Sequence, residues 1–492
     1  MPARIWVFWA LFLVRGAFYS SMLPLWEGWD EYAHFAYIQH WNEKGTLPRA
    51  GDRISREIDE SMRAAPLPHE LSWIGAPYLT HEQWWALPEA ERAERRRTLS
   101  SIPPSLAFQA AEPLPGRPPF VFYEAQQPPL YYWLAAPVAK SIATMPIAKR
   151  VPRLRLLSVL FASLAIPFTF LTARAMSGSV SLAGCAAALL AIAPGLAIDA
   201  SHVANDGLAI GLSAIFLWLL AREETHWALA GIVLGAAILT KASLLVLALV
   251  LVLAWFRKPK RWGLALGLAA AIGGWWYVRN VLIGVPLTGW QESVPLNVLA
   301  ASALRLIRTG RWIGGAQTVA KSFTWFGAWS FLTLRTWMYL VLEFLALAGM
   351  IAGLAMKRNA SVRIAVLFTV CFACAVAAGA AAYDAVHGIP GIPGWYLWPA
   401  GGAMAILIAV GYGRLTAFFA ALLALADLFG AGARMLPYYA GLAPWNHGSV
   451  TQAFEAWRRL QIPVWLVAIW LIATAGIPLL VWQAYGREKT RM

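Results

Sequence analysis

Apolar stretches of roughly 20 residues recur along this chain, and they constrain its fold more than any other feature. A stretch of that length suits a helix that crosses a bilayer, because the hydrocarbon core is about 30 Å thick. Of the 492 residues, 59% are hydrophobic and only 13% are charged, whereas soluble domains average about 25% charged residues. We therefore expect an all-α polytopic integral membrane protein in contact with membrane lipids, since helices satisfy their own backbone in lipid.

The apolar stretches and the polar segments between them divide the sequence into five regions. Together they predict a bundle of about 12 transmembrane helices, whose first extracytoplasmic loop is large and contains interfacial helices. No small-residue cleavage site follows the first apolar stretch, which is therefore expected to remain as a span. The regions are a first transmembrane span at 1–25, an extracytoplasmic loop at 26–128, a transmembrane core at 129–282, an extracytoplasmic segment at 283–335 and a C-terminal transmembrane region at 336–492.

The formal net charge of +15 is carried largely by short hydrophilic gaps, such as Arg257 to Arg261. By the positive-inside rule these gaps and both termini face the cytoplasm, which indicates a multi-pass protein of the plasma (inner) membrane. No aromatic-basic groove pattern points to nucleic acid. With the 26–128 loop outside, an even number of crossings must separate it from Asn205. Three apolar segments intervene, so one of them is expected not to cross fully: 129–147, 153–174 or 178–198.

An acidic motif follows the first predicted span, where Asp30-Glu31-Tyr32-Ala33-His34 comes directly after Trp-Glu-Gly-Trp. If a helix begins at Asp30, this residue and His34 share one face, and Glu31 lies one position round. A carboxylate beside a helix start and walled by aromatic rings is suited to act as a general base toward a hydroxyl group. The alternative is that Asp30 caps an interfacial helix, with Glu31 and His34 merely solvated.

Two further motifs lie at the ends of predicted spans. Gln127-Pro128-Pro129-Leu130-Tyr131-Tyr132 places two prolines at a helix start before an aromatic cluster, which suits either a substrate site or an aromatic belt at the interface. Asn205-Asp206 separates two apolar runs. Asp206 either caps the following helix or is functional, since ionisable residues near membrane depth usually are.

Two cations, Lys241 and Arg279, stand at the edges of apolar segments. Both would lie on the extracytoplasmic side, against the positive-inside tendency. Each is explained either by a bound phosphate, with which cations form charge-assisted hydrogen bonds, or by snorkelling of the side chain toward water.

Other chemistry finds little support in the sequence. It has no phosphate-binding Gly-Lys-Ser/Thr loop, no complete zinc-binding helix and no Gly-x-Ser-x-Gly elbow. The three cysteines all lie inside apolar runs, where helix packing explains them. A divalent metal, Mg²⁺ or Mn²⁺, remains an option at Asp30, Glu31 and Asp206, although carboxylates alone do not define a site.

In their order along the chain, these motifs resemble those of the GT-C superfamily of membrane glycosyltransferases. The likeness is to the protein O-mannosyltransferase and aminoarabinose-transferase type, and most of all to bacterial multi-pass relatives of unknown function. It extends from about residue 5 to about residue 410. The motifs that carry it are Asp30 to Phe35, Gln127 to Tyr132, Asn205-Asp206, Leu239 to Lys241, Trp276 to Asn280 and Tyr396 to Ala400.

The resemblance implies a GT-C-like bundle whose active site lies on the extracytoplasmic face. There a sugar would pass from a polyprenyl phosphate to an envelope lipid, glycan or protein, by direct displacement with inversion. Asp30 would be the base, and Glu31 would assist it or orient the acceptor. Lys241 and Arg279 would face the lipid phosphate. The other residues expected at the substrate are His34, Gln127, Tyr131, Asp206 and Tyr396.

The chain departs from the family pattern at two positions. Gln127 stands where relatives tend to carry His, and Trp395 stands where they carry Arg within Gly-Arg-Tyr. The second change removes one expected phosphate contact. Two other functions remain open: a transporter or flippase for a lipid-linked intermediate, although no internal repeat is visible, and a non-catalytic membrane assembly protein.

Overall fold

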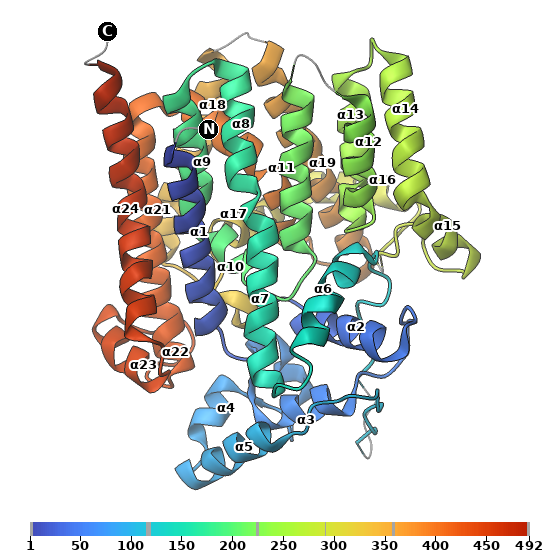
Figure 1. Ribbon diagram of the computed structural model, residues 1–492, viewed down its shortest axis with the longest axis vertical. Coiled ribbons are helices and arrows are strands. Elements are labelled where there is room, and N and C mark those ends of the chain that lie inside the picture. Colours follow the sequence, from blue (N-terminus) through green and yellow to red (C-terminus); the bar gives the residue numbers. More distant parts are fainter. Residues whose placement is uncertain (1–2, 115–119, 223–225, 291, 357–359, 490–492) are drawn as a thin grey trace.

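A computed structural model describes residues 3–114, 120–222, 226–290, 292–356 and 360–489. Helices that run roughly along one direction form a bundle, and a helical cap closes one end of it (Figure 1). The all-α prediction is confirmed for these residues, whose only strands are the two-residue β1 (Pro66–Leu67) and β2 (Leu79–Thr80), which pair in parallel.

The cap is formed by the polar loop that follows the first span, α1 (Ala3–Met22). Phe122 donates a backbone hydrogen bond to Asp52 and Ala111 donates one to Ile54, so that the end of the loop folds back on its start. The last helix of the cap has no buried residue, in agreement with the surface helix expected from its mixed charges. The helices of the cap are α2 (Glu31–Lys44), α3 (Arg56–Ala64), the 3-10 helix η1 (His69–Ile74), α4 (His81–Ala86) and α5 (Glu89–Ser101).

The segment that does not cross is α6 (Leu130–Ser141). This 12-residue helix packs against α2 and stays at the capped end of the bundle (Figure 1). The chain continues through α7 (Ile147–Ser163) and α8 (Ala165–Ser177), which together are long and apolar enough to cross a membrane, and then through α9 (Val180–Ile192) and α10 (Pro194–Ala200), which are bent by 59° to one another. The two crossings that the parity argument expects before Asn205 are obtained if the bent pair counts as one span.

The remaining helices complete the bundle. Tight packing is clearest between α18 and α20, where a Cβ added to Gly411 would lie 2.0 Å from the carbonyl oxygen of Gly349. The elements of this part are α11 (Asp206–Ala221), α12 (Trp227–Ile238), η2 (Ala242–Leu245), α13 (Val246–Ala254), α14 (Pro259–Ala269), the π-helix η3 (Ala270–Gly274), α15 (Trp275–Leu282), α16 (Leu296–Thr309), α17 (Trp312–Thr324), η4 (Ala328–Ser330), α18 (Thr336–Met356), α19 (Ala360–His387), η5 (Gly394–Ala400), α20 (Gly401–Tyr412), η6 (Gly413–Leu415), α21 (Thr416–Phe429), the π-helix η7 (Gly430–Met435), α22 (Leu436–Tyr439), η8 (Val450–Gln452), α23 (Ala453–Arg459) and α24 (Val464–Lys489).

The number of crossings predicted from the sequence is not confirmed. Within the described residues, 6 helices are long and apolar enough to cross a membrane, or up to 7 if the bent pair α9–α10 counts as one span. Three shorter apolar helices, α11, α12 and the η2–α13 unit, fall below that length. These shorter helices account for part of the difference from about 12.

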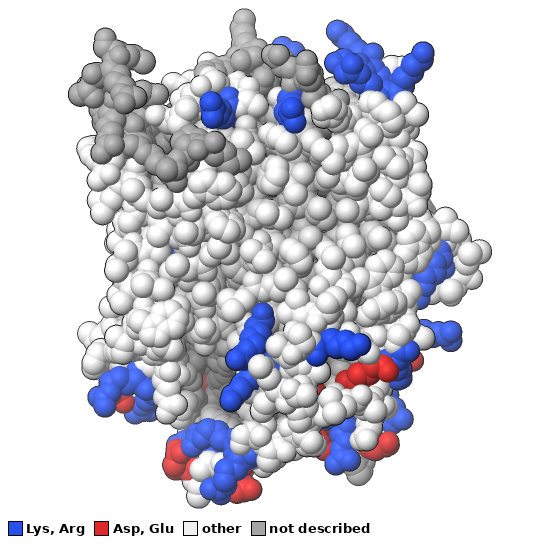
Figure 2. Space-filling view, in the orientation of Figure 1, with Lys and Arg blue, Asp and Glu red and all other residues white. Residues whose placement is uncertain are grey.

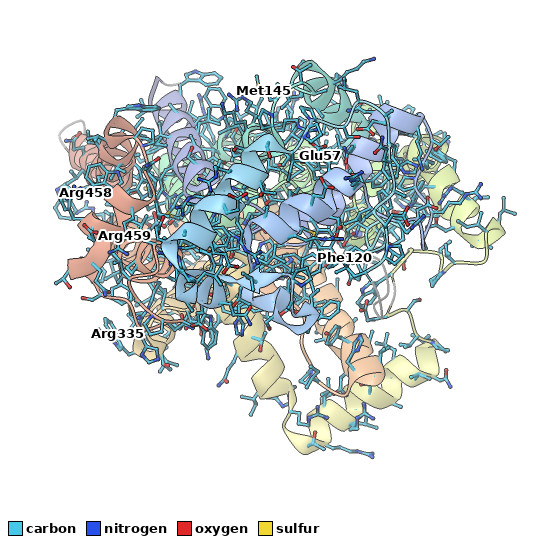
Figure 3. All side chains as sticks on the ribbon, turned by 90° about the horizontal axis from the view of Figure 1, so that it is seen from below. Glu57, Phe120, Met145, Arg335, Arg458 and Arg459 are labelled. Atoms are coloured by element: carbon cyan, nitrogen blue, oxygen red, sulfur yellow. The ribbon has the colours of Figure 1, made fainter. Side chains whose placement is uncertain are left out.

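Charged side chains gather at the two ends of the molecule. In the face that Figure 2 shows, a broad band free of visible charge separates an upper end with Lys and Arg from a lower, capped end with both signs. Figure 3 looks onto the capped end, where Glu57 lies over the middle of the molecule and Arg458 and Arg459 of α23 lie at its edge. Glu57 pairs with Arg150, which ties α3 to the start of α7. The distribution is that of a protein whose middle is surrounded by lipid.

One ion pair lies inside the bundle itself. The Nη2 of Arg15 on α1 is 2.9 Å from an Oδ2 of Asp427 on α21, and both side chains are fully buried. Tyr19 donates a hydrogen bond to the other carboxylate oxygen. These contacts join the first span to the C-terminal half of the bundle.

We expect Arg15→Met to lower the free energy of unfolding by about 3–5 kcal/mol, because it leaves the Asp427 carboxylate buried without its cation. Replacing both partners, as Arg15→Met with Asp427→Leu, should restore most of that stability. Unfolding by denaturing detergent, followed by circular dichroism, measures the difference. A double variant no more stable than the single one would show that the pair contributes net attraction of its own.

Candidate active site

The turn between α1 and α2 contains three acidic residues, Glu27, Asp30 and Glu31, whose carboxylates lie in three different environments. Two residues of this turn adopt left-handed backbone conformations, with φ of 67° at Trp26 and 48° at Asp30. Such conformations cost about 1–3 kcal/mol each in residues other than glycine and persist only where surrounding contacts enforce them. The contacts that enforce them here come from the carboxylates on either side of Asp30.

Glu31 is held from one side by Arg155 of α7. The guanidinium donates from Nε to Oε1 at 2.8 Å and from Nη2 to Oε2 at 2.6 Å, and neither side chain is exposed. Val203 adds a backbone N–H to Oε1 at 3.0 Å. Arg155 also donates to the carbonyl oxygens of Leu23 and Pro24, where α1 has ended. Glu31 is therefore fully engaged in fixing the turn.

Glu27 is held from the other side by the C-terminal half of the chain. Its Oε1 accepts from the Ser330 hydroxyl at 2.6 Å and is 2.9 Å from Nε2 of His81. Its Oε2 accepts from the Tyr439 hydroxyl at 3.1 Å and from the Ser330 backbone. Glu27 is fully buried, so this network fixes the turn against η4 and α22.

Asp30 occupies the N-cap position of α2, but its side chain forms no capping hydrogen bond. No ion pair or hydrogen bond holds this half-buried carboxyl among the described residues. Burial raises its pKa from 3.8 to about 7, while the nearby ammonium group of Lys241 lowers it and Glu70 and Asp206 raise it. Asp30 therefore does not cap α2 through its side chain, which was the alternative interpretation of the motif. Glu31 and His34, which that interpretation expected to be solvated, are buried.

Lys241 lies in the same electrostatic environment, at the end of α12. Its Nζ is 2.5 Å from Oδ1 of Asp206, the first residue of α11. The ammonium lies over the ring of Tyr396, 4.6 Å from the centroid. Both members of the ion pair are more than nine-tenths buried. Since an ammonium has three N–H donors, Asp206 leaves Lys241 with donors for a further ligand.

Glu124 is a fourth acid of this site, and sequence reasoning did not select it. Its side chain is 5% exposed and its Oε2 has no hydrogen-bond partner. Burial, followed by the charge of Asp30, raises its pKa from 4.5 to about 8. At neutral pH this carboxyl is therefore largely protonated and can donate a hydrogen bond.

Three more of the residues predicted for the site, Gln127, His34 and Tyr131, form hydrogen bonds within the protein around these acids. Gln127 accepts a hydrogen bond from the Asn205 side chain at 3.1 Å, which ties the 127–129 turn to the start of α11. His34 Nδ1 lies 2.8 Å from the Tyr132 hydroxyl, and burial lowers the pKa of His34 to about 3. Tyr131 lies 2.8 Å from the Ser158 hydroxyl and is fully buried. His34 is therefore neutral and, like Tyr131, is shielded from solvent.

Arg279 lies at the edge of the site. Its guanidinium lies 4.5 Å from the ring centroid of Trp276, and its charge acts on Tyr37, whose hydroxyl reaches the Gln127 carbonyl at 3.4 Å. The position expected to hold a further cation has Trp395, which stacks on Trp29 at 4.1 Å. Lys241 and Arg279 are thus the predicted phosphate ligands that the chain retains.

The structure brings Asp30, Asp206, Lys241 and Tyr396 into one electrostatic group and adds Glu124 to it. Sequence reasoning missed Glu124 because its neighbours come from distant segments. Its place three residues before Gln127, where the motif of the 127–132 segment begins, was the available signal. In the described part of the chain no three His, Cys, Asp or Glu side chains are close enough to hold a metal ion. The proposed ligands Asp30, Glu31 and Asp206 are thus not arranged as a ligand set, because Arg155 and Lys241 engage two of them.

An apolar cavity of about 750 Å³ lies next to the site, on the other side of η5. While Tyr396 of η5 faces Lys241, the next two residues of that helix, Leu397 and Trp398, line the cavity. Most of the rest of its wall comes from α9, α17, α18, α19 and α20, and Glu343 is the one acidic residue among the described residues that line it. A cavity of this volume and lining suits a hydrocarbon chain.

Comparisons with known proteins agree with the sequence resemblance. A family model described as dolichyl-phosphate-mannose-protein mannosyltransferase matches residues 120–293. The structure of ArnT from Cupriavidus metallidurans bound to undecaprenyl phosphate is similar over 98% of this chain and 76% of that chain, with a TM-score of 0.51 and 15% identity. No curated protein sequence matches the chain.

Two further structures are similar at lower scores. Apo ArnT from Cupriavidus metallidurans matches over 73% of this chain and 65% of that chain, with a TM-score of 0.42 and 17% identity. The apo oligosaccharyltransferase of Archaeoglobus fulgidus matches over 96% of this chain and 56% of that chain, with a TM-score of 0.36 and 15% identity. The likeness to the GT-C superfamily is confirmed by the family model and by the ArnT complex. The chain is a membrane protein with a GT-C fold.

The raised pKa of Asp30 leads to a prediction about stability. Between its ordinary pKa of 3.8 and about 7, the folded protein binds this proton more tightly than the unfolded chain, so Asp30 reduces stability progressively as the pH rises through that range. Asp30→Asn should therefore unfold at a higher temperature than the wild type at pH 8, with a smaller difference near pH 4.5. Thermal unfolding in detergent at both pH values tests this.

Asp52→Asn is the matched control, because that acid lies in the same loop and its Oδ2 accepts a hydrogen bond from the backbone of Arg49. A gain for Asp30→Asn that is equal at both pH values would contradict the assigned pKa.

Proposed function

We propose that the protein is a glycosyltransferase that moves a sugar from a polyprenyl phosphate to an acceptor hydroxyl at the capped face of the bundle. The observation that carries the proposal is Asp30. It is an unpaired carboxyl on a strained turn, held next to an ammonium group by two neighbouring carboxylates that are themselves fully engaged. Strain and unmade contacts of this kind occur where a residue serves a substrate rather than the fold.

In the proposed reaction Asp30 accepts the proton of the acceptor hydroxyl. The acceptor oxygen bonds to the anomeric carbon while the bond from that carbon to the phosphate oxygen breaks, which inverts the configuration. Both electrons of the broken bond leave with the phosphate, whose charge is stabilised by Lys241 and Arg279. Protonated Glu124 can donate a hydrogen bond within the same site.

The apolar cavity beside η5 supports a lipid substrate, because Leu397 and Trp398, which directly follow Tyr396 on η5, form part of its wall. We infer that it accommodates the hydrocarbon part of a lipid substrate, while the charged part remains at the ammonium group. Undecaprenyl phosphate is the natural test compound, because it is bound in the similar ArnT structure. The mixed charges of the capped end and the basic upper end favour an extracytoplasmic site and cytoplasmic termini.

We expect Asp30→Asn to lower the rate of sugar transfer by at least about 10²-fold, since a positioned general base contributes about 10²–10⁴-fold. The assay follows radiolabel from undecaprenyl-phosphate mannose or aminoarabinose into lipid, glycan and protein fractions of an envelope extract, with the purified protein in vesicles. Asp52→Asn is the control and should transfer at the wild-type rate. Binding of the donor by a wild type that transfers nothing would instead favour a lipid transporter or an assembly protein.

The pH dependence gives a separate prediction. Asp30 must be ionised to accept a proton, so kcat/KM for the donor should rise with pH through a midpoint at about 7. The charge of Glu70 raises the pKa of Asp30, so Glu70→Gln should shift the midpoint to lower pH without removing activity. Rate profiles from pH 5 to pH 9 measure both midpoints. A wild-type midpoint near 4 would contradict the raised pKa assigned to Asp30, and a midpoint that stays unchanged in Glu70→Gln would contradict its assignment to Asp30.

A further inference from the structure

Near Lys241 and Asp206 the structure contains two buried polar side chains without hydrogen-bond partners. Both carboxylate oxygens of Asp199 and both ring nitrogens of His202 are unpaired. Asp199 is 4% exposed and His202 is not exposed at all. A buried polar group left unpaired costs about 1–3 kcal/mol. Two such side chains, three residues apart, are therefore expected to have partners that come from outside the protein.

The backbone that carries them is firmly held. Asp199 lies in the last turn of α10, and His202 follows in the short connection to α11. Between them, the Ser201 hydroxyl donates to the carbonyl oxygen of Ala197 at 2.7 Å and also lies 3.1 Å from that of Gly16. The next residue, Val203, donates its N–H to Glu31. The unpaired groups therefore do not result from a loosely placed loop.

An aromatic wall closes one side of this pair. The ring of Trp29 meets His202 edge to face at 5.4 Å and stacks on Trp395 at 4.1 Å. Its indole N–H interacts with Asp199 but forms no hydrogen bond of normal geometry with it. Aromatic faces beside a few convergent polar groups are the usual lining of a small-molecule site.

The cluster adjoins the reacting groups. Asp199 interacts electrostatically with Asp206 and Lys241, so it lies near the proposed phosphate ligand. On the side of the cap, Glu124 and Asn205 each contribute one further unpaired buried oxygen. A group attached to a phosphate at Lys241 would therefore lie near the unpaired polar atoms of Asp199, His202, Glu124 and Asn205.

We propose that Trp29, Asp199 and His202 form the subsite for the sugar of the donor, and that this sugar is a neutral one with free hydroxyl groups. A hydroxyl both donates and accepts. It can donate to Asp199 while it accepts from the Trp29 indole, and a neutral His202 offers one nitrogen of each kind. An ammonium group only donates, so an amino group placed between Asp199 and Trp29 would leave the indole N–H of Trp29 without an acceptor.

This inference rests on the proposed function, and the test separates the two. We would measure binding of undecaprenyl phosphate and of undecaprenyl-phosphate mannose to the protein in nanodiscs. Saturation-transfer NMR with methyl α-mannoside provides a sugar readout that needs no lipid. The wild type should bind the mannose-bearing lipid more tightly than the bare lipid and should show contact to methyl α-mannoside.

Asp199→Asn and His202→Phe should each weaken binding of the mannose-bearing lipid by about tenfold, the equivalent of one lost hydrogen bond. Their affinity for bare undecaprenyl phosphate should not change, and the methyl α-mannoside signal should be lost. Thr474→Val is the matched control, because it removes another unpaired buried hydroxyl, on α24, and should leave every binding readout unchanged.

Two results would overturn this subsite. One is equal affinity of the wild type for both lipids with no methyl α-mannoside signal, in which case the orphan groups bind water only. The other is tighter wild-type binding of the aminoarabinose lipid than of the mannose lipid. Failure of bare undecaprenyl phosphate to bind the wild type would count against the proposed function instead, and the methyl α-mannoside signal would still decide the sugar subsite.

Discussion

The contact on which the candidate site depends is the guanidinium of Arg155. A single side chain of α7 binds both oxygens of Glu31 and donates hydrogen bonds to the carbonyl groups of Leu23 and Pro24, just after the end of α1. Five N–H donors in a rigid planar fork make this possible, and lysine could not replace them. Because the pair is fully buried, the loss of either partner would leave a charge without compensation. The entry of the chain into the cap is thus fixed in one geometry.

That geometry explains how three acids within five residues come to differ. Glu27 and Glu31 each accept several hydrogen bonds and are buried, so both carboxylates anchor the turn. Asp30 lies between them with its backbone in a left-handed conformation and its carboxyl unpaired. The strained backbone and unpaired carboxyl of Asp30 cost free energy, and the hydrogen bonds of Glu27 and Glu31 offset that cost. We regard this division as the main reason to place the chemistry at Asp30.

Much of the fold could be predicted from the sequence, because apolar length and charge distribution act locally. The polar cap, the exposed helix α5 and the parity of crossings before Asn205 all follow from such local patterns. The site could be predicted only in part. The pairing of Arg155 with Glu31 joins residues 124 positions apart, and no spacing rule connects them. An arginine inside an apolar run was nonetheless a signal, since a charge at membrane depth requires a partner. Asp199 and His202 were missed because a lone acid or histidine beside an apolar run is usually explained by packing or capping.

The stacking of Trp395 on Trp29 has a consequence for how this sequence can change. The family resemblance leads one to expect arginine at position 395, yet the indole there is the platform for the Trp29 ring, which in turn borders Asp199 and His202. Restoring the arginine alone would remove that platform. The two tryptophans are therefore coupled, and an arginine at position 395 would require a different residue at position 29 as well.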